Sequence, residues 1–296
     1  MNVNVKNKRQ WIYGYLFIAP VFIGLVIFYI YPFIKNILNS FCSINNFNAA
    51  KFIGVENYKQ ILHDGEFRQT AYNTFLYVII SVPIGIIIST LLAELLNTDI
   101  RGKSVYRTLY FLPAVTMPAA VAMVWKWIYN GQYGLLNQLC SLLKLPERSW
   151  ISDPKTALYM VIVVGIWSSA GYNMIILLAG RQGISKSYYE AAIIDGAGTI
   201  TQFFKITLPL LTPTLFFVSI TAMISSFQVF DIIYMMIGKT SIALESTQSL
   251  VMMFYRYAFE YGHKGYAAAI SIFIFLIILC ITVLQLRLQK KWVNYE

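Results

Sequence analysis

Six predominantly apolar runs, each long enough to cross a bilayer as a helix, divide the chain. A hydrocarbon core of roughly 30 Å requires about 20 helical residues at a rise of about 1.5 Å per residue. The runs extend over residues 11–31, 73–96, 107–129, 156–179, 214–237 and 266–288. They leave short connections, two longer loops and no room for a separate soluble domain. The pattern therefore predicts an all-α integral membrane protein with six transmembrane helices in one bundle.

The first run also fits a second interpretation, because a secretory signal peptide likewise begins with cations such as Lys6, Lys8 and Arg9. The apolar part of a signal peptide is usually roughly 7–15 residues long, which is shorter than residues 11–31. No small-residue cleavage site follows it. We interpret the run as an uncleaved first helix.

Composition supports lipid rather than water or nucleic acid as the surroundings. The chain is 58% hydrophobic and 12% charged, whereas an ordinary soluble domain is about 25% charged. Its net charge of +10 is typical of nucleic-acid binders, but such proteins must stay soluble, and this chain has a mean hydropathy of +0.61. A solvated globular enzyme is nearly excluded, and no nucleic-acid partner is expected.

The distribution of cations predicts the orientation of the helices. With six spans, both termini lie on one side, together with the short segments around Arg101 and Arg181. Lys and Arg are about twofold denser on that side than on the other. The positive-inside rule therefore places both termini in the cytoplasm.

Neither a metal site nor a nucleotide site is predicted. Cys42, Cys140 and Cys280 are odd in number and far apart in sequence, and His63 and His263 have no partner at helical ligand spacing.

A phosphate-binding loop is missing its first glycine. The only Gly-Lys-Ser sequence begins at Gly102, and Asn97 stands where that loop needs the first glycine. We therefore expect no bound metal and no bound ATP.

The connection between the fourth and fifth runs has the strongest local pattern. Ser187 and Glu190 have capping-box spacing, and the following residues to Asp195 favour a helix. Gly196 and its neighbours end that helix. A second capping box at 199–202 opens another helix, which extends to Pro209. Such a short exposed helix pair needs a docking partner.

The residues of this connection resemble the EAA loop of binding-protein-dependent ABC importer permeases. The similarity begins at Tyr189 and continues through a Leu-Pro pair to Pro213, and Phe111-Leu112-Pro113 in the third run agrees with the carbohydrate-type permeases of the maltose and glycerol-phosphate group. The loop residues to which the resemblance assigns ATPase coupling are Glu190, Ala191, Ala192, Asp195, Gly196, Ala197, Leu208 and Pro209.

The resemblance covers most of the chain and implies a type I importer permease. Residues 1–68 would form the N-terminus, first helix and external loop, residues 69–286 the permease core with the loop at about 180–213, and residues 287–296 a cytoplasmic tail. The protein would be a transport subunit, not an enzyme. It would be a multi-pass protein of the bacterial plasma membrane and would import a sugar, an oligosaccharide or a polyol phosphate.

The same resemblance implies the partners. These are a second, homologous permease in a heterodimer, two copies of a cytoplasmic ATPase that hold the ATP and magnesium, and an extracellular solute-binding protein. The loop would form coupling helices that insert into a cleft on the ATPase.

Polar residues inside the apolar runs are candidates for the substrate path, because polar groups at membrane depth must face protein or water. Amides, carboxylates and hydroxyls beside aromatic rings are the combination that binds sugars. The candidates are Tyr172, Asn173, Ser226, Phe227, Gln228 and Asp231. The alternative for each is a hydrogen bond between helices. Phe227 and Gln228 are favoured because the resembling maltose permease contacts substrate near this part of its fifth helix.

Charges and prolines near the ends of the runs have simpler interpretations. Glu94 and Lys126 are expected to extend toward the membrane surface, and Pro83, Pro113 and Pro118 are expected to kink the second and third helices.

A functional alternative from another class remains, namely a secondary transporter or membrane sensor that works without an ATPase. A secondary transporter would show internal repeats and interrupted helices in corresponding halves. The six runs show no such pairing.

Overall fold

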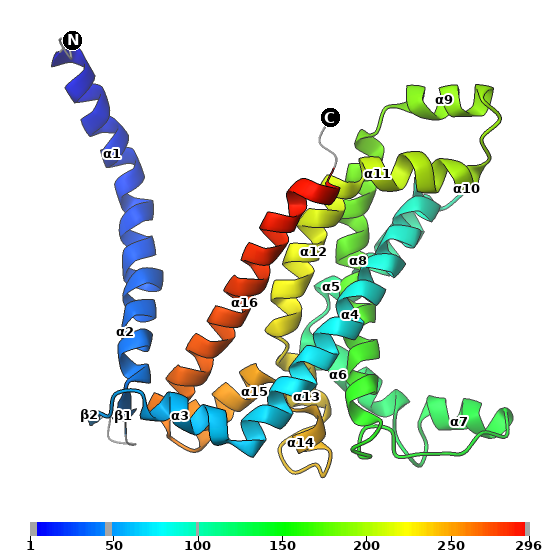
Figure 1. Ribbon diagram of the computed structural model, residues 1–296. Helices are drawn as coiled ribbons and strands as arrows, with labels where there is room; N and C mark the ends of the chain where they lie inside the picture. The colour runs from blue at the N-terminus through cyan, green and yellow to red at the C-terminus, as the bar shows by residue number, and fades with distance from the viewer. Residues whose placement is uncertain (1–4, 45–48, 99–100, 294–296) are drawn as a thin grey trace. The chain divides into compact units, whose positions relative to one another are not determined.

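The computed structural model describes residues 5–44, 49–98 and 101–293, and Figure 1 shows their helices and strands. The chain forms two compact units. The first consists of Met1–His63 and Phe254–Phe273, and the second consists of Asp64–Met253 and Ile274–Glu296.

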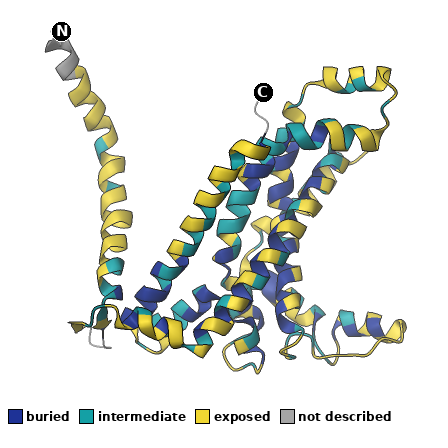
Figure 2. Cartoon of the chain, viewed as in Figure 1, coloured by how far each residue is buried: buried dark blue, intermediate teal, exposed yellow. Residues whose placement is uncertain are grey.

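The first unit begins with a long apolar helix. Its elements are α1 (Val5–Leu25), the π-helical turn η1 (Val26–Ile30), α2 (Tyr31–Ser40), β1 (Cys42–Ile44), β2 (Ala50–Phe52), α3 (Glu56–His63), the π-helical turn η3 (Arg256–Glu260) and the start of α16 (Lys264–Trp292). The first three elements continue one another, so the apolar helix extends over Gln10–Ser40, nine residues beyond the predicted end of the first run. Most of its residues are exposed, as their colour in Figure 2 shows, which suits a surface solvated by lipid.

The first unit also contains a short β-hairpin, although the fold is mostly helical as predicted. Strands β1 and β2 are antiparallel, with Ser43 opposite Lys51. The buried Asn57 holds the start of the hairpin, because its Nδ2 donates to the carbonyl oxygens of Ser40 at 2.8 Å and Cys42 at 3.1 Å. Backbone pairing of this kind belongs in a loop outside the hydrocarbon, where an open strand edge can be hydrated.

The second unit is a helical bundle. Its elements are α4 (Gly65–Asn97), α5 (Lys103–Val115), α6 (Pro118–Ile128), α7 (Leu135–Leu142), α8 (Ala157–Gly183), α9 (Lys186–Ile194), α10 (Thr199–Gln202), the π-helical turn η2 (Phe203–Thr207), α11 (Leu208–Leu210), α12 (Thr212–Phe227), α13 (Asp231–Met236), α14 (Leu244–Thr247), α15 (Leu250–Tyr255) and the rest of α16. Helices α4 and α8 pack together, and α12 packs against both. Buried residues gather where these three helices meet, as Figure 2 shows.

Helix α8 is central because its glycines allow three neighbours to approach closely. A Cβ at Gly165 would lie 2.0 Å from the Tyr77 hydroxyl on α4, and one at Gly180 would lie 2.3 Å from Thr214 Oγ1 on α12. At Gly171 a Cβ would lie 1.9 Å from the carbonyl oxygen of Tyr110 on α5. Small residues at helix contacts are typical of membrane bundles, because helices in lipid associate through close van der Waals packing and not through the hydrophobic effect.

The helical spans match the six apolar runs in approximate position, but two of the runs are interrupted helices. Gln10–Ser40, α4, α8 and α16 are each long and apolar enough to cross a bilayer, and two bent helix pairs bring the possible spans to six. The second span begins at Gly65, earlier than expected, because the Asp64 side chain caps α4 by accepting from the Glu66 N–H at 2.8 Å. Pro83 lies inside α4, which continues as one helix on both sides of it.

The third and fifth runs are broken helices. In the third run, α5 and α6 meet at an angle of 100°. The break falls at Thr116 and Met117, whose backbones are extended, because a residue before proline disfavours the helical region and Pro118 follows. The fifth run was expected to be helical over 214–237, but α12 ends at Phe227 and α13 begins at Asp231.

Replacement of Gly171 with alanine tests the packing of α8 against α5. The new methyl group would clash with the backbone of Tyr110, so we expect Gly171→Ala to destabilise the bundle by about 1–3 kcal/mol. The measurement is the thermal unfolding midpoint of the purified protein in detergent. Gly183→Ala, on the same helix with nothing within 4 Å of the new Cβ, is the matched control. Equal midpoints for the two variants would contradict the close approach.

Candidate functional site

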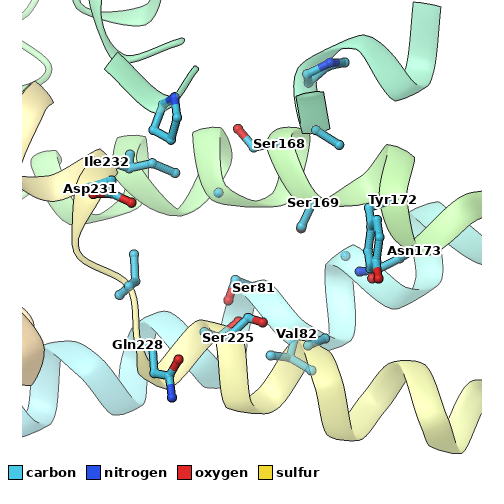
Figure 3. Close-up of a pocket in the computed structure, with 18 of the residues that line it drawn as sticks. Ser81, Val82, Ser168, Ser169, Tyr172, Asn173, Ser225, Gln228, Asp231 and Ile232 are labelled. Carbon is cyan, nitrogen blue, oxygen red and sulfur yellow. The ribbon is translucent and has the colours of Figure 1, made fainter. Parts of the chain in front are cut away.

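A cavity of about 360 Å³ lies among the helices of the second unit. Figure 3 shows labelled side chains around it from α4, α8 and the end of α12. The polar residues that line it are Ser81, Thr116, Ser168, Ser169, Tyr172, Asn173, Thr221, Ser225, Ser226, Gln228 and Asp231. Three helices and two helix breaks, one at Thr116 and one before Asp231, therefore contribute hydroxyl, amide and carboxylate groups to one space.

Five of the six residues that the sequence placed on the substrate path line this cavity. They are Tyr172, Asn173, Ser226, Gln228 and Asp231. Phe227 is different, because it is 1% exposed and packs edge-to-face on Phe75 of α4, with ring centroids 5.4 Å apart. One residue of a helix advances about 100°, so a cavity-facing Ser226 turns its neighbour into the core.

The sequence reasoning missed the serines of α4 and α8. Ser168 and Ser169 lie one helical turn before Tyr172 and Asn173, so the i, i+4 spacing of polar residues in an apolar helix was the signal for them. On α4, Ser81 lies one helical turn after Tyr77 and one turn before Gly85. All three residues line the cavity.

Two hydroxyls at the cavity are unpaired within the described residues. The Oγ atoms of Ser81 and Ser168 are buried and make no hydrogen bond there. Asn173 is 5% exposed and also belongs to the lining. Unpaired buried polar groups are costly at membrane depth, so these hydroxyls suit hydrogen bonds to water or to a solute that enters.

The break between α12 and α13 forms one wall of the cavity. Residues 228–231 line it, and the backbone of Val229 is held from the opposite side by Ser249, whose Oγ donates to the Val229 carbonyl at 2.6 Å. Non-helical backbone at membrane depth is tolerated where it is buried in protein or faces a water-filled cavity. The break is therefore tolerated because its residues face the cavity.

Asp231 is the single ionisable carboxylate in the lining, and no Lys, Arg or His lines the cavity within the described part of the chain. The net electrostatic character of this wall is negative. The cavity can therefore bind hydroxyl-rich, uncharged groups through its amides and hydroxyls, and it offers no cation to an anionic solute.

The second candidate region is the helix pair formed by α9 and the α10–α11 segment. Figure 1 shows both at the end of the second unit where α8 ends. Helix α9 begins earlier than predicted, because the cap is Ser185, whose Oγ accepts from the Ser187 N–H at 3.4 Å. Ser187 and Glu190 therefore lie inside the helix and form no capping box.

The second predicted capping box is also absent. Helix α10 is preceded by Gly198, which has no side chain to cap with, and Gln202 Nε2 donates instead to the Ala197 carbonyl at 2.8 Å. The helix that follows was predicted to extend to Pro209 and extends to Leu210 through η2.

Gly196 ends α9 in the way that the sequence predicted. Its φ of 79° is in the left-handed region, which a residue with a side chain disfavours. The N–H of Ala197 donates to the Ala192 carbonyl at 2.8 Å, and the N–H of Gly196 donates to the Ile193 carbonyl at 3.0 Å. These two bonds form a Schellman motif, which fixes the angle at which the chain leaves α9.

The coupling candidates divide into an exposed group and an anchoring group. Glu190, Ala191, Asp195 and Gly196 are exposed, and Ala192 and Ala197 are partly buried. Leu208 packs against the core between α4, α8 and α12, with Pro209 beside it in α11.

Large apolar side chains are also exposed on this helix pair. They are Ile193, Ile194, Ile200 and Phe204, with Ile194 at 86%. Exposed apolar side chains that form a contiguous patch are typical of a protein-binding surface.

Comparison with known families gives a match over most of the chain. Residues 62–294 match the model of the family described as "Binding-protein-dependent transport system inner membrane component". This range contains both the cavity and the helix pair.

Several known proteins are similar to this chain over nearly its whole length. The "Probable ABC transporter permease protein YesP" of Bacillus subtilis is 35% identical, covering 98% of this chain and 94% of that protein. The "Trehalose/maltose transport system permease protein MalF" of Thermococcus litoralis is 32% identical, covering 97% and 98%. A chain from the crystal structure of a bacterial alginate ABC transporter, with an alginate-bound periplasmic protein, shares the fold at a TM-score of 0.85 and 22% identity, covering 96% of each chain.

Thiol labelling tests which side of α12 faces the cavity. In a variant whose three native cysteines are replaced with alanine, we expect Ser225→Cys to react with a water-soluble thiol reagent, because Ser225 is exposed in the cavity. Phe227→Cys should stay unreacted, because the side chain at this position is buried against α4. Labelling is measured by the mass of the purified protein. Equal labelling of both positions would contradict the assigned face.

Proposed function

Because the chain belongs to the family of binding-protein-dependent transport system inner membrane components, the permease subunits of ABC importers, we propose that it forms part of the translocation path for a carbohydrate. The proposal rests chiefly on the cavity, where hydroxyl, amide and aromatic side chains of α4, α8 and α12 face one space. As a permease the chain is a transport subunit and not an enzyme. Family membership disfavours the alternative of a secondary transporter or sensor without an ATPase.

The cavity favours a saccharide as the solute. Tyr172 supplies a ring for the C–H face of a sugar, and Asn173 and Gln228 supply amides for its hydroxyls. The Oγ atoms of Ser81 and Ser168 add hydrogen-bonding groups with no partner in the described chain. The name of the trehalose/maltose relative agrees with this class of solute.

Among sugars, oligosaccharides and polyol phosphates, the charge of the cavity favours an uncharged solute. Asp231 would repel an anion, and no cation in the described lining offsets it. At a separation of about 8 Å and an effective dielectric constant of about 20, two unit charges repel by about 2 kcal/mol, which is roughly 30-fold in affinity.

The helix pair of α9 and α10–α11 is proposed to couple this path to an ATPase. Glu190, Asp195 and the apolar Ile194 are exposed together on a segment with little core of its own. Carboxylates beside exposed apolar side chains suit a cleft on the ATPase that has apolar walls and basic residues at its edge. ATP and magnesium would be held by the ATPase, and this chain would bind neither.

The chain is an inner membrane component of an ABC transport system. We propose that both termini and the helix pair are cytoplasmic, in accord with the cation density of those segments. The proposed assembly contains a second, homologous permease, two ATPase copies and an extracellular solute-binding protein. The periplasmic protein in the alginate transporter structure is a partner of the same kind.

Replacement of Gly196 tests the coupling role. A β-branched side chain at a φ of 79° is strained, so Gly196→Val should redirect the end of α9 and abolish solute uptake while the protein stays inserted in the membrane. Uptake and membrane abundance are measured in the same cells. Gly198→Ala, at a φ of −71° with nothing within 4 Å of the new Cβ, is the control that should keep uptake. Normal uptake by Gly196→Val would refute this role.

Substitution of Asp231 tests the preference for uncharged solutes. In the reconstituted importer, Asp231→Asn keeps a hydrogen-bonding side chain and removes the negative charge. We therefore expect an anionic saccharide to compete with the transported solute up to about 30-fold better than in the wild type. Ser226→Ala, an uncharged change in the same lining, should not alter the ratio between anionic and uncharged competitors. The same ratio in Asp231→Asn and wild type would contradict an electrostatic role for Asp231.

A further inference from the structure

A charged pair joins the ends of α4 and α8 inside a nearly uncharged bundle. Arg181 Nε lies 2.7 Å from Glu94 Oε2, and Arg181 Nη2 donates to Glu94 Oε1 at 3.2 Å. The Arg181 side chain is 12% exposed and the Glu94 side chain is 27% exposed. The carboxylate is held by this two-point contact with the guanidinium.

Helix polarity alone does not account for Glu94. It lies in the last turn of α4, where the negative end of the helix dipole disfavours a carboxylate. Arg181 lies near the end of α8, where a cation is favoured. The acid is therefore placed to hold the arginine, and the two-point contact fixes the direction of the guanidinium plane.

The guanidinium group of Arg181 also contacts α9, the first helix of the proposed coupling pair. Arg181 Cζ lies 4.3 Å from the centroid of the Tyr189 ring on α9, which is a cation–π contact. The Tyr189 hydroxyl is 3.0 Å from Thr207 Oγ1 in η2, and Thr207 is 1% exposed. Glu94, Arg181, Tyr189 and Thr207 thus form one chain of contacts, which we call the relay.

Helix α9 has few other attachments to the bundle. No residue of α9 is buried among those described. Its cap, the Ser185–Ser187 contact, is local and exposed. Side-chain contact through Tyr189 is therefore the main way in which a displacement of α9 can reach the helices, apart from its two chain connections.

The relay ends on the helices that line the cavity. Ser81 of α4 and Ser168 and Asn173 of α8 face the cavity, and Glu94 and Arg181 lie farther along the same two helices. Both helices are single, unbroken segments, so they can move as rigid bodies. A push on α9 that is transmitted by the relay would displace both walls together.

We propose that the relay transmits movement of α9 to α4 and α8 and so links ATP hydrolysis to opening and closing of the cavity. This inference rests on the proposed function. In it, Glu94, Arg181 and Tyr189 are positioning residues that contact neither solute nor nucleotide. Loss of the relay would leave the ATPase docked and active while the cavity responds poorly, so hydrolysis would continue with less transport.

The test is the number of solute molecules transported per ATP hydrolysed by the complete importer in proteoliposomes. We expect Arg181→Gln and Glu94→Gln each to lower this ratio roughly tenfold, within the usual range of coupling between sites. The double variant should be no worse than Arg181→Gln alone, because that change already removes both the Glu94 pair and the contact with the Tyr189 ring. Arg287→Gln removes an exposed cation from α16 and should keep the wild-type ratio.

A milder variant guards against failure to fold. Tyr189→Phe keeps the ring beneath Arg181 and loses only the hydroxyl that meets Thr207, so it should lower the ratio less than Tyr189→Leu, which removes the ring as well. Binding of the ATPase to each variant is measured by co-purification and should match the wild type.

The outcomes separate the relay from the proposed function. A wild-type importer without ATP-dependent uptake would overturn the proposed function. Normal wild-type uptake together with an unchanged ratio in the Arg181, Glu94 and Tyr189→Leu variants would overturn the relay alone. A reduced uptake that follows only a loss of protein or of bound ATPase would also overturn it, because the relay then serves assembly.

Discussion

The structure depends on one constraint, which is that backbone polar groups inside a bilayer must be satisfied by the chain itself or by water in a cavity. The long helices α4, α8 and α16 meet it along their whole length. Where the helical pattern stops, at Thr116 and at residues 228–230, the chain lines the cavity, and the Val229 carbonyl also accepts from Ser249 Oγ. The breaks thus mark where a polar space exists within the bundle.

Helix α8 connects the parts of the molecule that matter for function. Its glycines allow α4, α5 and α12 to approach at Gly165, Gly171 and Gly180. Between them, Ser168 and Asn173 face the cavity, and beyond them Arg181 reaches α4 and α9. A single helix therefore lines the cavity and contacts the helix pair proposed to couple to an ATPase, and a rigid helix suits that double contact.

The scarcity of charge makes each charged group in the bundle informative. Ionisable residues at membrane depth are costly and tend to be paired or functional. Asp231 is the one carboxylate in the described lining of the cavity, and the Glu94–Arg181 pair joins α4 and α8 and contacts α9 through Tyr189. The net charge of +10, by contrast, arises mainly in the connections and near the termini, and the proposed orientation rests on its distribution there.

By itself, the sequence determined the membrane class, the approximate spans, the loop resemblance, and the glycine that ends α9, because apolar length and the left-handed preference of glycine are local properties. Tertiary structure decided which of two neighbouring residues faces the cavity, so Gln228 lines it while Phe227 packs on Phe75. It alone revealed the pairing of Glu94 with Arg181, residues 87 positions apart in the chain. Such partners depend on how α4 and α8 meet, and helix periodicity predicts the face of a helix but not the neighbour that covers it.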